Sequence, residues 1–597
     1  MTRRRQAKGP TEVELDLGRY ELRRSGRRIK LERKPMELLI LLVGRRDQLV
    51  SRNEIVTTLW PSDFFIDAEA NVNNITRKLR TALKDRAEKP RFLETVVGKG
   101  YRFVGPVRVI SPRFSQFNAG TLQSGGHAAP SSSMAVLVPV ADGDFMEGAA
   151  ICLGLADALV ARLANLQGVD VLPTSAVLKL PPEASPAEIS ASLGVRFVVH
   201  GRLRMSKGQV RLALEMFDTH LQGSCFTHKF DVDVNRVFEA GEGIAKQIAS
   251  TLHRPLRSPP VQANARFSRD PLAYAEFMQG YRLSSSGDPT VMESAIQHLV
   301  NAVARDPNFA LAHATLSQAC ASRHFDFDPA GVWLDKAEFH CQRALESSPV
   351  LAEGHVAKAF LLWGPSKNFQ HLEAIAELRR ALALQKNLPR AYNRLGTILA
   401  HVGLLDRARE MYERGRPFHP KRQLSHSIVQ VYVWGGEYDL ALEETERWQA
   451  ENPTHMYPLY FGIQAALLSK NWELADVLLS TAGQRLGDEP LIASLQGLFC
   501  ALTGKETKGL DYVTRACANP KSFGHAHHTY YQIANTLAVL GRRAAAFEWL
   551  DRSVSTGFAC WPFFQRDPYL ENVRALPEFE VLVSSLQAKY PDHLGLL

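Results

Sequence analysis

Internal repetition is the feature that most constrains what this chain can fold into. In the C-terminal half, Gly403–Ala408 recurs 33 residues later as Gly436–Ala441, and the related Lys470–Ala475 follows after 34 more. Small residues recur where paired helices must approach closely: Ala295, Ala302, Ala344, Ala381, Ala408, Ala441 and Ala475. A period of this length indicates helix pairs that bury their apolar faces only by stacking on their neighbours. We therefore predict an all-α superhelix.

The repeats resemble tetratricopeptide repeats, about seven or eight of them over residues 268–595. The likeness implies a concave surface that binds an extended peptide or a protein, or self-association as a homo-oligomer. Trp363, Tyr392, Tyr432 and Tyr460 could line that surface, although we favour a place for them in the core between repeats. The aromatic-rich stretch Gly557–Pro568 is expected to cap the last repeat.

The net charge is concentrated at the N-terminal end. Residues 1–107 hold 24 Lys and Arg against 14 Asp and Glu, a balance of +10, whereas the whole chain of 597 residues carries +9. A basic end on an almost neutral body indicates an anionic partner for that end.

Residues 12–107 have the pattern of a small α+β unit. Alternating runs between residues 14 and 31 predict short strands, an apolar run at 35–42 predicts a buried helix, and Ser51–Glu54 forms a capping box that begins a second helix. A third helix is expected over 68–85, followed by a hairpin around Gly98-Lys99-Gly100. Strands, three helices and a hairpin in this order are typical of a winged helix-turn-helix.

The third helix is polar on one face and apolar on the other. At about 100° per residue, Asn73, Arg77, Arg80 and Lys84 fall on one face, and Ile75, Leu79 and Ala82 point the other way. Such a helix fits the major groove of DNA, where Arg pairs with guanine and Asn with adenine, while other cations hold phosphates. The alternative is that these charges form a solvated helix face.

The strings Ser51–Glu54, Val72–Leu83 and Gly98–Phe103 resemble the C-terminal effector domain of OmpR/PhoB-type regulators, in particular the CadC-like and HilA-like regulators that place this domain first. The resemblance implies transcription regulation and phosphorelay signal transduction, although no phosphoacceptor receiver domain is visible. It also implies a recognition helix at 68–85, Lys99 on a minor-groove wing, and a loop at 61–67 that faces RNA polymerase. The implied contacts with double-stranded DNA are Asn73, Asn74, Arg77, Lys78, Arg80, Lys84, Lys99 and Arg102, and those with the polymerase are Ser62, Asp63, Phe64 and Phe65.

The middle of the chain separates these two ends. Small, polar and turn-forming residues dominate 108–133, which predicts a flexible linker. Residues 134–256 alternate strands with helices, which indicates a small α/β domain. This part is similar to TolB amino-terminal-like domains, a resemblance that implies no catalytic chemistry and assigns no ligand. His200, on an expected strand, is interpreted as a structural residue rather than a metal ligand.

The sequence contains no constellation that predicts catalysis, a cofactor or a metal. H-E-x-x-H and G-x-S-x-G are absent, and the stretch that begins at Asp326 like a calcium loop has Ala337 where a bidentate Glu is needed. His525, His527 and His528 lie close together, but without a nearby carboxylate or Cys we favour a surface or helix-start cluster. Sparse cysteines, no secretory leader and no apolar run of roughly 20 residues predict a cytoplasmic protein without membrane contact.

The sequence therefore predicts a multidomain protein that is not an enzyme: a winged helix-turn-helix, a small α/β domain and an all-α tetratricopeptide superhelix. The function it favours is that of a bacterial transcriptional regulator that binds promoter DNA. One alternative is a tetratricopeptide scaffold whose winged helix docks protein rather than DNA. Another is an enzyme that uses the middle domain.

Overall fold

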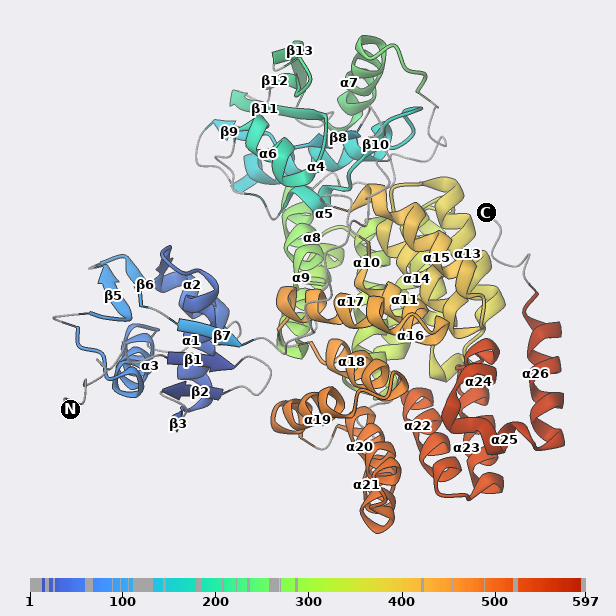
Figure 1. Ribbon diagram of the computed structural model, residues 1–597. Coiled ribbons are helices and arrows are strands. Elements are labelled where there is room, and N and C mark those ends of the chain that lie inside the picture. The colour runs from blue at the N-terminus through green and yellow to red at the C-terminus, as the bar shows by residue number, and fades with distance from the viewer. Residues whose placement is uncertain are drawn as a thin grey trace, which may run out of the picture. The chain divides into compact units, whose positions relative to one another are not determined.

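The computed structural model describes residues 13–16, 21–24, 27–29, 31–59, 68–87, 90–96, 98–105, 107–110, 133–142, 146–178, 180, 185–206, 209–221, 223–233, 237–256, 268, 270–284, 288–419, 424–453, 455–487, 489–518 and 524–591. The chain divides into two compact units (Figure 1). One comprises Met1–Leu122 with Trp472–Arg485, and the other Gln123–Asn471 with Leu486–Leu597.

A four-stranded sheet opens the N-terminal unit. Strands β1 (Val13–Asp16), β2 (Glu21–Arg24) and β3 (Arg27–Ile29) form an antiparallel meander, as the alternating sequence predicts. The fourth strand, β7 (Val107–Ile110), pairs in parallel with β1. The predicted start of the linker at 108 is therefore wrong, because these residues complete the sheet; positions 111–132 of the predicted linker lie outside the described residues.

Three helices pack around one apolar core in this unit: α1 (Arg33–Gly44), α2 (Arg52–Leu59) and α3 (Ala68–Leu83). The Ser51 hydroxyl accepts a hydrogen bond from the Glu54 N–H at 3.1 Å, which confirms the predicted N-cap of α2. The Glu54 carboxylate itself contacts Arg45. The second helix is thus tied to the turn that precedes β4.

A second sheet carries the wing. Strands β4 (Leu49–Ser51), β5 (Leu93–Val96) and β6 (Gly100–Phe103) lie in the order β4-β6-β5, and β5 and β6 form the predicted hairpin. Gly98, in the turn, has φ +73°, a conformation that side chains disfavour. Gly100 is required for space, since a Cβ there would lie 2.0 Å from the Val50 carbonyl oxygen on β4.

The second unit begins with an α/β layer. Its elements are β8 (Ser133–Val136), β9 (Val140–Asp142), α4 (Met146–Leu163), β10 (Asp170–Val171), α5 (Thr174–Val177), α6 (Pro186–Leu193), β11 (Phe197–Ser206), β12 (Gln209–Asp218), β13 (Gly223–Asp233) and α7 (Val237–Thr251). The strand order is β10-β8-β11-β12-β13, with β9 also paired to β11. Helices α4 and α7 share one core with the sheet, so the predicted α/β layer is confirmed.

The rest of this unit consists of helices in the residues that the structure describes. They are α8 (Pro271–Leu283), α9 (Pro289–Arg305), α10 (Ala310–Asp326), α11 (Gly331–Ser347), α12 (Ala352–Leu362), α13 (His371–Leu384), α14 (Pro389–His401), α15 (Leu405–Gly415), α16 (Val429–Gly435), α17 (Tyr438–Glu451), α18 (Tyr457–Leu468), α20 (Pro490–Leu502), α21 (Glu506–Ala518), α22 (Ala526–Val539), α23 (Arg543–Ser555), α24 (Trp561–Arg566), α25 (Glu571–Arg574) and α26 (Pro577–Lys589). The other unit contains nearly all of α19 (Trp472–Leu486). Consecutive helices pack in pairs, such as α10 with α11 and α14 with α15. The seven recurrent alanines are all 0% exposed, as the repeat pattern predicts.

The first helix of several pairs is buried almost all round. Buried residues number 13 of 17 in α10, 11 of 12 in α18 and 11 of 14 in α22. Trp363 and Tyr460 are each 1% exposed and Tyr392 is 8% exposed, which confirms the favoured interpretation that these aromatics belong to the core. Tyr432 is only half-buried.

The C-terminal segment packs against earlier repeats. The N–H of Ala559 donates to the His401 carbonyl at 2.8 Å, Arg566 donates to the Trp434 carbonyl at 2.8 Å, and the Tyr569 hydroxyl donates to the Leu467 carbonyl at 2.6 Å. These carbonyls lie at the C-terminal ends of α14, α16 and α18. The stretch Gly557–Pro568 packs on the last helix pair through Tyr531, as expected of a cap, and it also closes the array on earlier repeats.

Candidate nucleic-acid interface

Helix α3 presents a polar, exposed face. Asn73, Asn74, Arg77 and Lys84 are exposed. The opposite side is buried in the core of the unit through Val72, Ile75, Leu79 and Leu83. The apolar packing of Val72 through Leu83 thus fixes which side chains α3 can offer to a partner. The Arg77 guanidinium donates to the Asn74 side-chain oxygen at 3.3 Å, one turn away on the same face.

Asn73 joins three elements of the unit. Its Oδ1 accepts hydrogen bonds from Arg52 at 3.0 Å and from the Tyr101 hydroxyl at 3.2 Å. Arg52 begins α2, Tyr101 lies on β6 of the wing, and the Arg52 guanidinium also donates to the Tyr101 hydroxyl at 3.2 Å. This network holds α2, α3 and the wing together at the exposed face. Arg52 and Tyr101 both belong to the sequence motifs given above, but only the structure shows that they bind Asn73.

Arg80 differs from the other predicted contacts on α3. Its side chain is only 11% exposed and forms an ion pair of 3.3 Å with Asp85, whose side chain is 0% exposed. Arg80 also donates to the Thr95 hydroxyl on β5 at 2.7 Å. Asp85 in turn accepts the N–H groups of Arg91 at 2.7 Å and Leu93 at 2.9 Å. Arg80 is thus engaged in fastening the end of α3 to the wing, not extended into solvent with Arg77.

The remaining predicted cations lie around the same helix and the wing. Lys78 contacts Glu32 at 2.6 Å, and Arg102 pairs with Glu94 across the β5–β6 hairpin at 3.2 Å. Lys84 follows the last residue of α3 with φ +49°, a left-handed conformation that ends the helix. Lys99 is exposed at the tip of the wing, where its carbonyl accepts the Arg52 N–H at 3.2 Å. The predicted polymerase-facing residues Ser62, Asp63, Phe64 and Phe65 lie outside the described residues.

A comparison with protein families addresses this unit. Residues 26–103 match the family model "Transcriptional regulatory protein, C terminal". The chain carries a winged-helix domain of the OmpR/PhoB type. This domain spans the first helix, the polar helix α3 and the wing, the elements that the sequence motifs indicate.

Two relatives are similar over this domain. The transcriptional regulator HilA of Salmonella typhimurium is 35% identical over 104 residues, which are 17% of this chain and 18% of HilA. The response regulator protein GraR of Staphylococcus aureus is 33% identical over 90 residues, which are 15% of this chain and 38% of GraR. This chain therefore spans less than half the length of either relative.

Among solved structures, the helical half is similar to proteins with helical repeats. YrrB, described as a TPR protein with an unusual peptide-binding site, aligns over 30% of this chain and 91% of its own with 17% identity and a TM-score of 0.23. A tetratricopeptide repeat protein from Parabacteroides merdae aligns over 48% of this chain and 100% of its own with 12% identity and a TM-score of 0.30.

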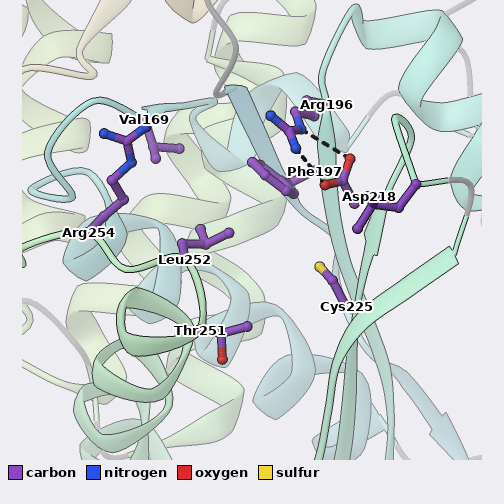
Figure 2. A pocket seen from close by; sticks show the side chains of 9 residues that line it. Val169, Arg196, Phe197, Asp218, Cys225, Thr251, Leu252 and Arg254 are labelled. Atoms are coloured by element: carbon purple, nitrogen blue, oxygen red, sulfur yellow. Dashed lines mark hydrogen bonds and ion pairs between the residues drawn. The ribbon is translucent and has the colours of Figure 1, made fainter.

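The α/β layer contains a recess of about 280 Å³, lined by residues of its strands and of the end of α7 (Figure 2). Two of its charged groups are paired with each other: Arg196 donates two hydrogen bonds, of 3.1 and 2.8 Å, to the Asp218 carboxylate. Burial raises the pKa of the nearby Cys225 thiol, with a smaller contribution from the Asp218 charge, so this thiol is a poor nucleophile. The recess thus brings together no activated nucleophile or acid–base pair among its described lining residues.

His200 lies opposite Glu215 on the neighbouring strand, with 3.8 Å between Nε2 and Oε2, which is consistent with a structural role.

None of the helices in the described ranges combines the length and hydropathy that a bilayer-spanning helix requires.

Proposed function

We propose that this chain is a transcriptional regulator that binds double-stranded DNA by placing α3 in the major groove. The observation that carries the proposal is the exposed row Asn73, Asn74 and Arg77 on a helix whose other side is locked into the core. Amides and a guanidinium are the groups that pair in bidentate fashion with adenine and guanine. The likeness to HilA and GraR over the same residues supports this use of the helix.

In this proposal the wing contacts the adjacent backbone. Lys99 stands exposed at the tip of the β5–β6 hairpin, and the Arg52–Tyr101–Asn73 network sets the position of the wing relative to α3. Lys78, Lys84 and Arg102 would contribute phosphate contacts, which position a protein on DNA without reading its sequence. Arg80 would act indirectly, by holding α3 against β5.

The rest of the chain would serve protein contacts. We propose that the helical half binds a protein or mediates self-association, and that the loop at 61–67 faces RNA polymerase, as in the family. Such a protein would act in the cytoplasm and would carry no catalytic activity.

Salt-dependent binding of the full chain to duplex DNA tests this proposal. With about five to eight phosphate contacts, log K should fall with log salt at a slope of roughly −0.9 per contact. Replacing Arg77 by Ala should lower the affinity by about 1–3 kcal/mol and relax selectivity at one base position, whereas Lys99→Ala should weaken all duplexes alike.

A matched control is Arg211→Ala, which removes an exposed arginine that pairs with Asp231 in the α/β layer. This variant should bind as the parent does. If the parent chain binds no duplex, the scaffold alternative replaces the DNA-binding function. If the parent chain binds duplex but Arg77→Ala and Lys99→Ala leave the affinity unchanged, the proposed orientation of α3 and the wing on DNA is wrong.

A further inference from the structure

Four histidine side chains converge inside the helical half. His401 ends α14, and His525, His527 and His528 lie at the start of α22; one ligand nitrogen from each lies within 4.8 Å of all the others. His401 is 0% exposed, His527 1% and His528 3%, and His525 is half-buried. The expected helix-start position of His525, His527 and His528 is confirmed, whereas a surface location is wrong, because the closure of the array places these imidazoles in its interior.

The hydrogen bonds of two rings fix their tautomers. The Nδ1 atoms of His401 and His527 each lie 2.8 Å from a backbone carbonyl oxygen, those of Thr397 and Thr556 respectively. A carbonyl only accepts hydrogen bonds, so each Nδ1 carries the proton and each Nε2 presents a lone pair. A backbone carbonyl that orients a histidine through its other nitrogen is the usual outer-shell arrangement of metal ligands.

Two nitrogens of the cluster are buried without a hydrogen-bond partner among the described residues. They are Nε2 of His527 and Nδ1 of His525. Buried polar atoms are nearly always paired, and an orphaned one calls for a missing water or ion. The Nε2 lone pair of His527 therefore accepts no hydrogen bond from the described residues.

The spacing of the nitrogens suits a tetrahedral ion. Zinc–nitrogen bonds of about 2.0–2.1 Å imply nitrogens about 3.3–3.4 Å apart at the corners of a tetrahedron. The Nε2 atoms of His401 and His528 lie 3.3 Å apart.

We propose that His401, His525, His527 and His528 form a binding site for one divalent transition-metal ion that prefers imidazole ligands. The expected ion is Zn²⁺. The ion would join α14 to α22 across about 125 positions of sequence. It would thereby fasten the C-terminal repeats to the middle of the array. The proposal is independent of DNA binding.

The test uses the full chain without an affinity tag. Cobalt(II), added to the chelator-treated protein, should bind at one equivalent and give the intense visible absorption of a tetrahedral site without a thiolate charge-transfer band. Zn²⁺ should displace the cobalt and raise the Tm, whereas Mg²⁺ should do neither. A weak octahedral cobalt spectrum, or no rise in Tm with Zn²⁺, would overturn the proposal.

Variants identify the ligands. His527→Gln and His528→Gln should each weaken metal binding by at least about tenfold, since the loss of even an outer-shell partner costs about 10–100-fold. The matched control is His313→Gln, another buried histidine, which contacts His340 and lies outside the cluster. If the cluster variants fold and bind the metal with unchanged affinity, the assignment of these histidines as ligands is refuted. If the variants do not fold, the cobalt spectrum of the parent chain is the test of the proposal.

Discussion

At the scale of single residues, Arg80 makes structural contacts with Asp85 and Thr95 that its position on the helix does not predict. Replacing Arg80 by Ala leaves the buried Asp85 carboxylate without its cation, although its backbone donors remain. We expect a loss of about 1.5–3 kcal/mol in the stability of this unit, which is the usual contribution of a hydrogen bond to a charged group. Hydrogen–deuterium exchange of the end of α3 and of β5 in the full chain measures this loss.

The control for Arg80 is Arg102→Ala. Arg102 and Glu94 form a pair whose side chains are 39% and 41% exposed, and such surface pairs contribute about 0–1 kcal/mol. Exchange rates that rise equally in both variants would show that Arg80 does not fasten α3 to the wing.

The two residues also show how far sequence reasoning reaches. Helical spacing places Arg77 and Arg80 on one broad face, and periodicity correctly predicts which side of α3 is apolar. The spacing cannot predict that the chain turns after Leu83 and brings Asp85 and Thr95 to Arg80. Those partners come from outside the helix, so its periodicity contains no signal for them.

At the scale of elements, the wing depends on the close approach of β4 and β6. A Cβ at position 100 would lie 2.0 Å from the Val50 oxygen and 2.9 Å from the Ser51 Cα, so Gly100→Ala must push the two strands apart. We expect it to release the wing and to reduce the protection of the β6 amides against hydrogen exchange by at least about tenfold, the equivalent of 1.4 kcal/mol.

Gly98→Ala is the comparison for Gly100→Ala. Gly98 has φ +73°, and a Cβ added there would meet no atom of the described residues within 4 Å, so this substitution meets only the conformational strain of about 1–2 kcal/mol. It should leave the β4–β6 pairing in place. Loss of that pairing in Gly98→Ala, with retention in Gly100→Ala, would contradict the steric argument.

Strands and helices formed by neighbouring residues were predictable in this chain, and distant pairings were not. The β1–β2–β3 meander and the β5–β6 hairpin follow from local alternation and turn residues. Strand β7 pairs with β1 in parallel from the far end of the unit, and its short sequence Val107–Ile110 resembles the start of a linker. Parallel pairing needs a long connection, so no local turn marks it.

At the scale of the whole molecule, His371 links the middle of the helical array to its C-terminal segment. Its Nε2 lies 3.1 Å from the Gly557 carbonyl oxygen, and its Nδ1 lies 3.3 Å from the Tyr590 hydroxyl. Burial lowers the pKa of His371 to about 4, although the hydrogen bond with the Gly557 carbonyl acts in the opposite direction. Burial therefore keeps the ring neutral in the folded chain.

This pKa predicts how acid affects the array. The folded pKa is below the unfolded value of about 6.5, so the stabilising effect is complete above pH 6.5 and is lost as the pH falls toward 4. At pH 5 the loss from His371 amounts to about 2 kcal/mol. Thermal unfolding of the parent chain and of His371→Gln between pH 7 and 5 measures it, and the variant should show the smaller decline.

If the stability of the parent chain and that of His371→Gln declined equally between pH 7 and 5, His371 would not be the source of the acid sensitivity. His220→Gln serves as the control, since His220 is an exposed histidine of the α/β layer; this variant should decline as the parent does.

Repeat periodicity predicted the helix pairs and their alanines, because each pair is specified by adjacent residues. It did not predict the closure by residues 524–590, which depends on the accumulated curvature of many pairs. The sequence pointed to His525, His527 and His528 as a group but not to His401, which stands more than 120 positions away.

The closure also sets an order of events during synthesis. The ends of α14, α16 and α18 leave the ribosome well before the residues around Ala559, Arg566 and Tyr569 that cover them. Until residues 559–569 have been synthesised, apolar surface on the earlier repeats lacks its final cover, and such surface promotes aggregation. A nascent chain that stalls before residue 559 should therefore be a client for chaperones.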